Sequence, residues 1–156
     1  MNKALNRGGT WKRLLANMAV FSFVTVFGLS LPSSATGNVV KSDLAGVWQM
    51  TIIGQTGCGF GTSVYTFTLN AAGQATNVTG VHHNGCGDNT SSGDTFTINT
   101  LAGSGSGTAG LTCGTGCGWV LTIQVSPDRT IMSVADVEPT NPNNFIVGTA
   151  IHKNAQ

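Results

Sequence analysis

Apolar and polar residues alternate along most of the chain after residue 44, and this pattern predicts β-strands. The segment 118–125 shows it most clearly, because Trp119, Leu121, Ile123 and Val125 share one face. Alternation over four to eight residues between turn residues is typical of strands that bury one face. We expect eight such strands, at residues 47–53, 62–69, 75–82, 94–100, 108–112, 118–125, 130–137 and 145–152.

The composition indicates an all-β fold. Glycine and threonine are abundant, and Glu, Lys and Arg are so scarce after residue 35 that no segment predicts an amphipathic helix. Short antiparallel strands form either an eight-stranded up-and-down barrel or a two-sheet β-sandwich. An immunoglobulin-type sandwich has a tryptophan between two bridged cysteines, but here Trp48 precedes all four cysteines and Trp119 follows them. We predict the barrel, since closure also removes edge strands that this chain has few charged residues to protect.

The first 35 residues have the pattern of a secretory signal peptide. Basic residues up to Arg13 precede a mostly apolar run from residue 14 to 31, and Ser33 and Ala35 are the small residues that a signal peptidase reads. An uncleaved membrane anchor is the alternative, but Asn17 interrupts the apolar run. We expect a signal peptide at 1–35, a lead-in at 36–44 and a β-barrel domain at 45–156. The form of the signal predicts a bacterial protein that is secreted, periplasmic or extracellular.

Removal of this leader makes the protein mildly acidic. Three basic residues, Lys41, Arg129 and Lys153, then face six acidic residues, for a net charge of −3 with histidine neutral. Three scattered cations form no basic patch, which argues against nucleic acid as a partner. No second apolar run of spanning length follows, so we expect no membrane span in the mature chain.

Four cysteines in an exported chain indicate disulfides, with three alternative pairings. Cys113 and Cys117 flank a three-residue turn, so they can lie opposite each other across a hairpin. Geometry therefore favours this pair, and Cys58 with Cys86 would join two loops.

Redox and metal chemistry are the alternatives for these side chains. A redox pair is usually a Cys-x-x-Cys sequence at the start of a helix, and "CGTGC" matches neither condition. A zinc or copper site would use His82 and His83 with the nearby thiols. Adjacent residues on a strand point to opposite faces, so the two histidines suit an exposed polar loop better than a ligand set, and we expect no cofactor.

An up-and-down barrel would gather all four cysteines at one end. The connections after the first, third and fifth strands contain the cysteines, with His82 and His83 at the edge of the second of them. The connections after the second, fourth and sixth strands contain neither cysteine nor histidine. We therefore predict a cysteine-bearing rim that contacts a ligand or a protein partner.

The stretch "LAGVW", Leu44 to Trp48, resembles the Gly-x-Trp signature that begins the first strand of calycin barrels, the lipocalins and avidins. The following "SVYTFTLNAAGQATNVTG" is similar to the second and third strands of an avidin, and the pair Gly118 and Trp119 resembles one on a later avidin strand. The resemblance implies a barrel in which Trp48 faces inward and closes one end.

Three departures limit what the resemblance implies about ligands. Avidins have an asparagine or aspartate where Met50 stands, and a second tryptophan where Ile123 stands. Lipocalins often pack the first-strand tryptophan against an arginine near the last strand, but Arg129 lies before the seventh expected strand. The resemblance therefore supports the architecture and does not support biotin binding.

The sequence leaves two functions open. In the first, the barrel lumen binds a small apolar or amphipathic ligand; the expected lining is Trp48, Met50, Tyr65, Phe67, Trp119, Leu121 and Phe145. In the second, these side chains fill a solid core, and the protein is a structural or protein-binding module at the cell surface. No catalytic motif is present, and we expect Asp94 and Asp136 at exposed strand positions, so no catalytic residue is assigned.

Overall fold

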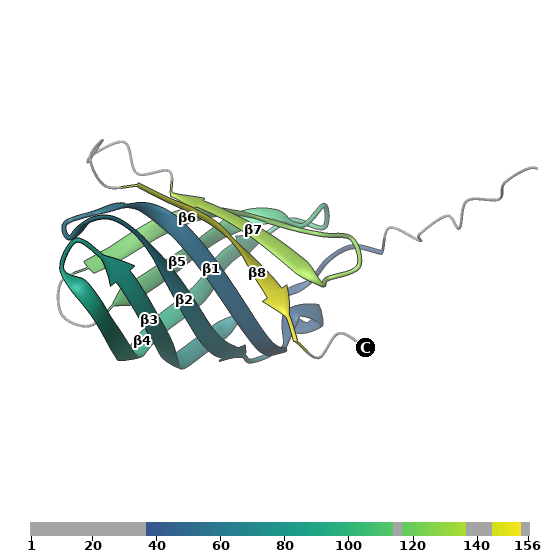
Figure 1. Cartoon of the computed structure of the whole chain (residues 1–156). Helices are drawn as coiled ribbons and strands as arrows, with labels where there is room; N and C mark the ends of the chain where they lie inside the picture. The colour runs from purple at the N-terminus through teal and green to yellow at the C-terminus, as the bar shows by residue number, and fades with distance from the viewer. Residues whose placement is uncertain (1–36, 114–116, 137–144, 154–156) are drawn as a thin grey trace, which may run out of the picture. The chain divides into compact units, whose positions relative to one another are not determined.

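The computed structural model describes residues 37–113, 117–136 and 145–153. They form one closed antiparallel barrel in which each strand pairs with the next along the chain and β8 pairs with β1 (Figure 1). The strands are β1 (Gly46–Thr56), β2 (Gly59–Leu69), β3 (Gln74–Asn84), β4 (Gly87–Leu101), β5 (Ser106–Cys113), β6 (Cys117–Val125), β7 (Ile131–Asp136) and β8 (Phe145–His152). The predicted fold class is confirmed.

The strands at one end extend beyond the predicted ones. The polar stretch 83–93 was expected to form a loop, but β3 and β4 continue through most of it and pair Asn84 with Gly87 around a two-residue turn. The prediction was wrong because both faces of this hairpin are polar, so no alternation marks it. Backbone pairing needs no apolar face, and the ladder continues past the core.

A β-bulge changes the inward face of β3. Asn77 has a left-handed backbone, φ 68°, and the register with β4 shifts on either side of Val78. An extra residue at a bulge moves the following side chains to the other face. As a result Ala75 and Val78 are both buried, and His82 points inward further along the strand.

One end of the barrel is plugged by the lead-in. We call this the closed end; it comprises the short 3-10 helix Lys41–Leu44 and the connections β2–β3, β4–β5 and β6–β7. Val39 and Leu44 are buried there, and Figure 1 shows the helix beside the end of β8. The side chain of Arg129 donates to a carboxylate oxygen of Asp43 (3.2 Å), so the arginine fastens the lead-in rather than packing below Trp48.

Trp48 closes this end from inside. Its indole N–H donates to the carbonyl oxygen of Leu44 (2.8 Å), and its ring stacks on His152 with centroids 4.6 Å apart. Gly46 has a φ of 140°, and a Cβ there would collide with the His152 ring, so glycine is required next to the stack.

The opposite end, which we call the cysteine end, carries the connections β1–β2, β3–β4, β5–β6 and β7–β8. A disulfide joins Cys58 to Cys86, with the Cα atoms 5.2 Å apart, and thereby links two hairpin turns. Cys113 is also disulfide-bonded, and the ladder places Cys117 opposite it, although the side chain of Cys117 lies outside the described part. No described cysteine is free.

Candidate functional site

Six of the seven predicted lining residues are buried in the barrel interior, and one is not. Trp48, Met50, Tyr65, Phe67, Trp119 and Leu121 are all less than one-tenth exposed. Phe145 is 46% exposed, so its prediction was wrong, and its neighbour Ile146 points inward instead. Both faces of β8 are apolar, so alternation alone could not decide which one faces the core.

The interior toward the closed end is packed with apolar side chains. Phe67 stacks on Phe96 with ring centroids 4.9 Å apart, and Phe96, Ile98 and Leu111 have no exposed surface. Such packing excludes water. The ring nitrogens of His152, which stacks on Trp48, are also buried there and have no hydrogen-bond partner among the described residues.

A chain of polar side chains crosses β2, β3 and β4 at the cysteine end. The hydroxyl of Ser63 lies 2.8 Å from Nδ1 of His82, and Nε2 of His82 lies 2.9 Å from the hydroxyl of Ser91. Ser91 in turn donates to a carboxylate oxygen of Asp94 at 2.5 Å. These four side chains, Ser63, His82, Ser91 and Asp94, form what we call the polar chain.

The direction of each hydrogen bond in the polar chain follows from the number of protons available. Ser91 has a single hydroxyl proton and donates it to Asp94. Nε2 of His82 must then donate to the Ser91 oxygen, because that oxygen has only lone pairs left. In neutral His82 the other nitrogen, Nδ1, is an acceptor and receives the proton of Ser63. The carboxylate therefore orients all three bonds toward itself.

Gly80 provides the space for this arrangement. A Cβ at this position would lie 2.6 Å from the Ser91 hydroxyl and 2.7 Å from Nε2 of His82. Any larger residue would thus displace the central hydrogen bond of the polar chain. The register pairs Gly80 with Tyr65 on β2 and with Ser91 on β4.

Tyr65 packs against the polar chain. Its ring meets the ring of His82 edge-on, with centroids 5.3 Å apart. Burial, and then the negative charge of Asp94, raise the pKa of Tyr65 to about 12, against a smaller lowering by a hydrogen bond with Ser63. Tyr65 therefore stays protonated at neutral pH and offers a hydroxyl group.

Asp94 and Asp136 were both expected to be exposed, and both expectations were wrong. Asp94 is 1% exposed and Asp136 is half-buried. Alternation along β4 places Asp94 on the same face as Phe96 and Ile98. The sequence therefore already indicated that Asp94 points inward. Alternation along β2 likewise places Ser63 on the face of Tyr65 and Phe67. The sequence gave no signal that joins Ser63 or Ser91 to His82, because His82 lies on another strand.

Trp119 adds a polar group without a partner. Its side chain is 8% exposed, and its indole N–H has no hydrogen-bond partner in the described part of the chain. An indole nitrogen can only donate, so a ligand oxygen or a water molecule would satisfy it.

The two histidines of the predicted metal site point to opposite sides of β3. His82 belongs to the polar chain inside, and His83 is exposed and pairs with Asp88. Within residues 37–113, 117–136 and 145–153, no group of three or more His, Cys, Asp or Glu side chains is placed to hold a metal ion.

Lysine and arginine are confined to the closed end in the described part of the chain. The ammonium group of Lys41 donates to the carbonyl oxygen of Ile98 (2.6 Å), Arg129 lies in the β6–β7 connection, and Lys153 follows β8. The cysteine end instead carries Asp88, Asp94 and Asp136. Its electrostatic potential should therefore favour neutral or cationic ligands over anions.

The interior at the cysteine end contains a small hollow beside Ser63. Its volume is about 20 Å³, enough for one water molecule. The lining residues are Ile52, Gly54, Thr56, Gly61, Thr62, Ser63, Asn84 and Ile146.

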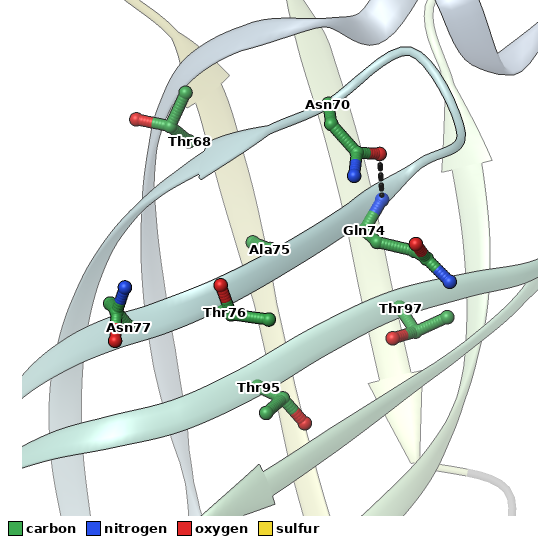
Figure 2. A pocket seen from close by; sticks show the side chains of 8 residues that line it. All are labelled: Thr68, Asn70, Gln74, Ala75, Thr76, Asn77, Thr95 and Thr97. Atoms are coloured by element: carbon green, nitrogen blue, oxygen red, sulfur yellow. Dashed lines mark hydrogen bonds between the residues drawn. The ribbon is translucent and has the colours of Figure 1, made fainter.

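A larger hollow, of about 530 Å³, lies on the outer wall over β2, β3 and β4 (Figure 2). It is lined by Thr68, Asn70, Gln74, Ala75, Thr76, Asn77, Thr95 and Thr97. Figure 2 shows the Asn70 side chain accepting a hydrogen bond from the backbone of Gln74 (3.0 Å), which is turn chemistry. None of these lining side chains is charged or aromatic, so we place the candidate site at the cysteine end.

No family model matches the sequence, and no curated protein is similar enough to count as a relative. Among the described residues there is no helix of the length and apolar character needed to cross a membrane. The barrel is compatible with a calycin-like architecture. Only the geometry of the site indicates a function.

Proposed function

We propose that the protein is an exported binding protein that takes a small amphipathic ligand at the cysteine end of its barrel. The observation that carries the proposal is the polar chain, which joins the buried Asp94 to three half-buried side chains at the cysteine end. Buried polar groups lower stability unless they are fully hydrogen-bonded, so they are uncommon in barrel interiors without a role.

The ligand would make two kinds of contact, one polar and one apolar. Its hydroxyl or ammonium head group would donate a hydrogen bond to the Ser63 oxygen and lie near the acidic side chains of this end, while its apolar part would lie against the rings of Tyr65 and Trp119. The packed interior beyond Phe67 and Phe96 keeps an alkyl chain out of the deeper lumen, so a long chain would lie along the mouth and partly in solvent. We therefore propose binding at the mouth rather than deep in the lumen, with a neutral or cationic head group.

A non-catalytic surface module is the second candidate, and the packing toward the closed end favours it. Trp48, Met50 and Phe96 are fully buried, as they would be in a solid core. In that case the polar chain would only fix the register of β2, β3 and β4, and a protein partner would contact the rim.

Titration with two detergent-like ligands separates these candidates. Dodecylamine and lauric acid have the same chain length and opposite charge, and tryptophan fluorescence reports binding near Trp119. We expect a saturable change with dodecylamine, weaker binding of laurate, and a smaller difference at high salt. Trp119→Phe should remove the response. If neither ligand gives a saturable change, the result favours the second candidate, a non-catalytic surface module with a solid core.

A pair of neighbouring histidines gives a matched control. His82→Gln alters the polar chain inside the barrel, and His83→Gln alters only the exposed partner of Asp88. We expect dodecylamine binding to weaken in the first variant and to stay unchanged in the second. Equal effects would place the ligand outside the barrel.

Export is the second part of the proposal. The expected signal peptide at 1–35 and the Cys58–Cys86 disulfide both suit an oxidising compartment. Expression of the full chain in a bacterium, followed by cell fractionation and intact mass measurement, tests it. We expect the exported form to begin after Ala35; an intact chain retained in the cytoplasm would contradict export.

A further inference from the structure

We propose that Ser63 is an activated nucleophile that accepts short acyl groups from esters. The proposal rests on the same site at the cysteine end as the proposed function, but it does not require an amphipathic ligand. Its basis is the directed polar chain, in which a serine hydroxyl donates to a histidine nitrogen whose other nitrogen is oriented by further groups. This is the arrangement by which a neighbouring base activates a weak nucleophile.

The polar chain matches the serine–histidine–aspartate arrangement in roles, with one departure. In that arrangement the carboxylate contacts the histidine directly and stabilises the imidazolium that forms. Here the Ser91 hydroxyl stands between them and transmits the polarisation from Asp94 to Nε2 of His82. Ser91 and Asp94 are positioning residues, since neither would touch the substrate.

Ser63 is half-buried and borders a small hollow. It lines the hollow of about 20 Å³ at the cysteine end, whose walls include Gly54 and Gly61. A space of this size takes one water molecule or a methyl group. We therefore expect acetyl esters to react and esters of longer acids to be excluded.

The chemical step is a simple acyl transfer. The oxygen of Ser63 attacks the ester carbonyl carbon and forms a new C–O bond, while its proton moves to Nδ1 of His82. The bond to the leaving alcohol then breaks, and the oxygen of this alcohol accepts the proton from Nδ1 of His82. Water then attacks the acyl-serine in the same way and releases the carboxylic acid, which restores Ser63.

The expected rate gain is modest. A positioned general base contributes roughly a 10²- to 10⁴-fold acceleration. The polar chain supplies only this proton transfer and the orientation of the base.

The test uses the mature protein and p-nitrophenyl acetate. We expect release of nitrophenol together with addition of one acetyl group, located at Ser63 by peptide mass spectrometry. Ser63→Ala should lose this acetylation, and the exposed serine variant Ser133→Ala should keep it. Acetylation confined to lysines, or equal reactivity of the Ser63→Ala variant, would overturn the proposal.

Histidine variants identify the base. His82→Gln should lower acetylation of Ser63 by roughly 10²-fold or more, whereas His83→Gln should leave it unchanged. If nitrophenol release depends on His82 but not on Ser63, the imidazole itself is the nucleophile and the assignment to Ser63 is wrong.

Two further measurements separate chemistry from folding and from binding. Ser91→Ala should lower the maximal rate of acetylation more than the apparent KM, an effect that a structural role alone would not produce. Ser63→Ala should unfold at the same denaturant concentration as the parent protein, so that its loss of acetylation is not a loss of folding. The parent protein should both bind dodecylamine and become acetylated. Binding without acetylation would overturn this inference alone, and acetylation without binding would overturn only the proposed function.

Discussion

The two ends of the barrel interior are built from the same strands but have different chemistry. Toward the closed end, Trp48 and the Phe67–Phe96 pair fill the space, and the buried indole N–H of Trp48 is satisfied by Leu44. Toward the cysteine end the interior holds the polar chain, and the indole N–H of Trp119 has no partner among the described residues. Unpartnered ring nitrogens occur at both ends, since those of His152 at the closed end also lack a partner among the described residues. The polar chain is therefore the feature that distinguishes the cysteine end, and it is there that we propose the site.

The largest expected effect is at the closed end. Phe96→Ala should lower the free energy of unfolding by about 3–5 kcal/mol, because it leaves a cavity against Phe67. Denaturant unfolding measures this loss. Ser63→Ala, at the cysteine end, should change stability far less. Similar losses from both variants would mean that the two ends do not divide stability and function.

The disulfide is the exception to this division, since it stabilises the cysteine end. Replacing Cys58 and Cys86 together by alanine frees a loop with a sequence separation of 28. We expect a loss of about 3–4 kcal/mol, because the unfolded chain regains that freedom. Hydrogen exchange should increase in the β1–β2 and β3–β4 turns, and the slowest amides around Trp48 should also exchange faster, because they open by global unfolding. Unchanged exchange of these slowest amides would contradict an effect on the unfolded chain.

The pH dependence of stability should report the burial of Tyr65 and, to a smaller extent, the charge of Asp94 beside it. Its pKa is raised to about 12 in the folded protein from 10.0, so the folded state favours the neutral phenol. The stabilisation is full below pH 10 and is lost as the pH rises toward 12, by roughly 3 kcal/mol in all. Denaturant titrations of the parent protein and of Tyr65→Phe measure it. Equal alkaline losses in both would assign the effect to other groups.

The smallest of these effects concerns the hydrogen bond that closes the barrel. Trp48→Phe keeps an aromatic ring against His152 but leaves the Leu44 carbonyl without its donor. We expect a loss of about 1–3 kcal/mol, measured by thermal or denaturant unfolding, with dodecylamine binding unchanged. A change in binding would show that the two ends are coupled.

Much of the fold could be predicted because local patterns specify it. The alternation in 118–125 places Trp119 and Leu121 inside, and it does so correctly. The polar hairpin at 83–93 could not be predicted in this way, since a strand that is polar on both faces looks like a loop. The bulge at Asn77 was also missed, because one extra residue in a threonine-rich strand leaves no mark in the alternation.

The candidate site could be predicted only in part. The sequence indicated that His82 lies near the cysteine end and that Tyr65 and Trp119 face inward, and the structure agrees. It did not join His82 to Ser63 and Ser91, because no spacing rule connects residues on different strands.

By itself the sequence determined that the chain forms eight strands, that they close into a barrel and that the cysteines gather at one end. These properties follow from local alternation and from the order of the connections. Only the tertiary structure decided that Ile146 rather than Phe145 faces the core, and that Ser63, His82, Ser91 and Asp94 form one chain. The physical reason is that strand register is set by pairing across the whole barrel, and register decides which side chains meet.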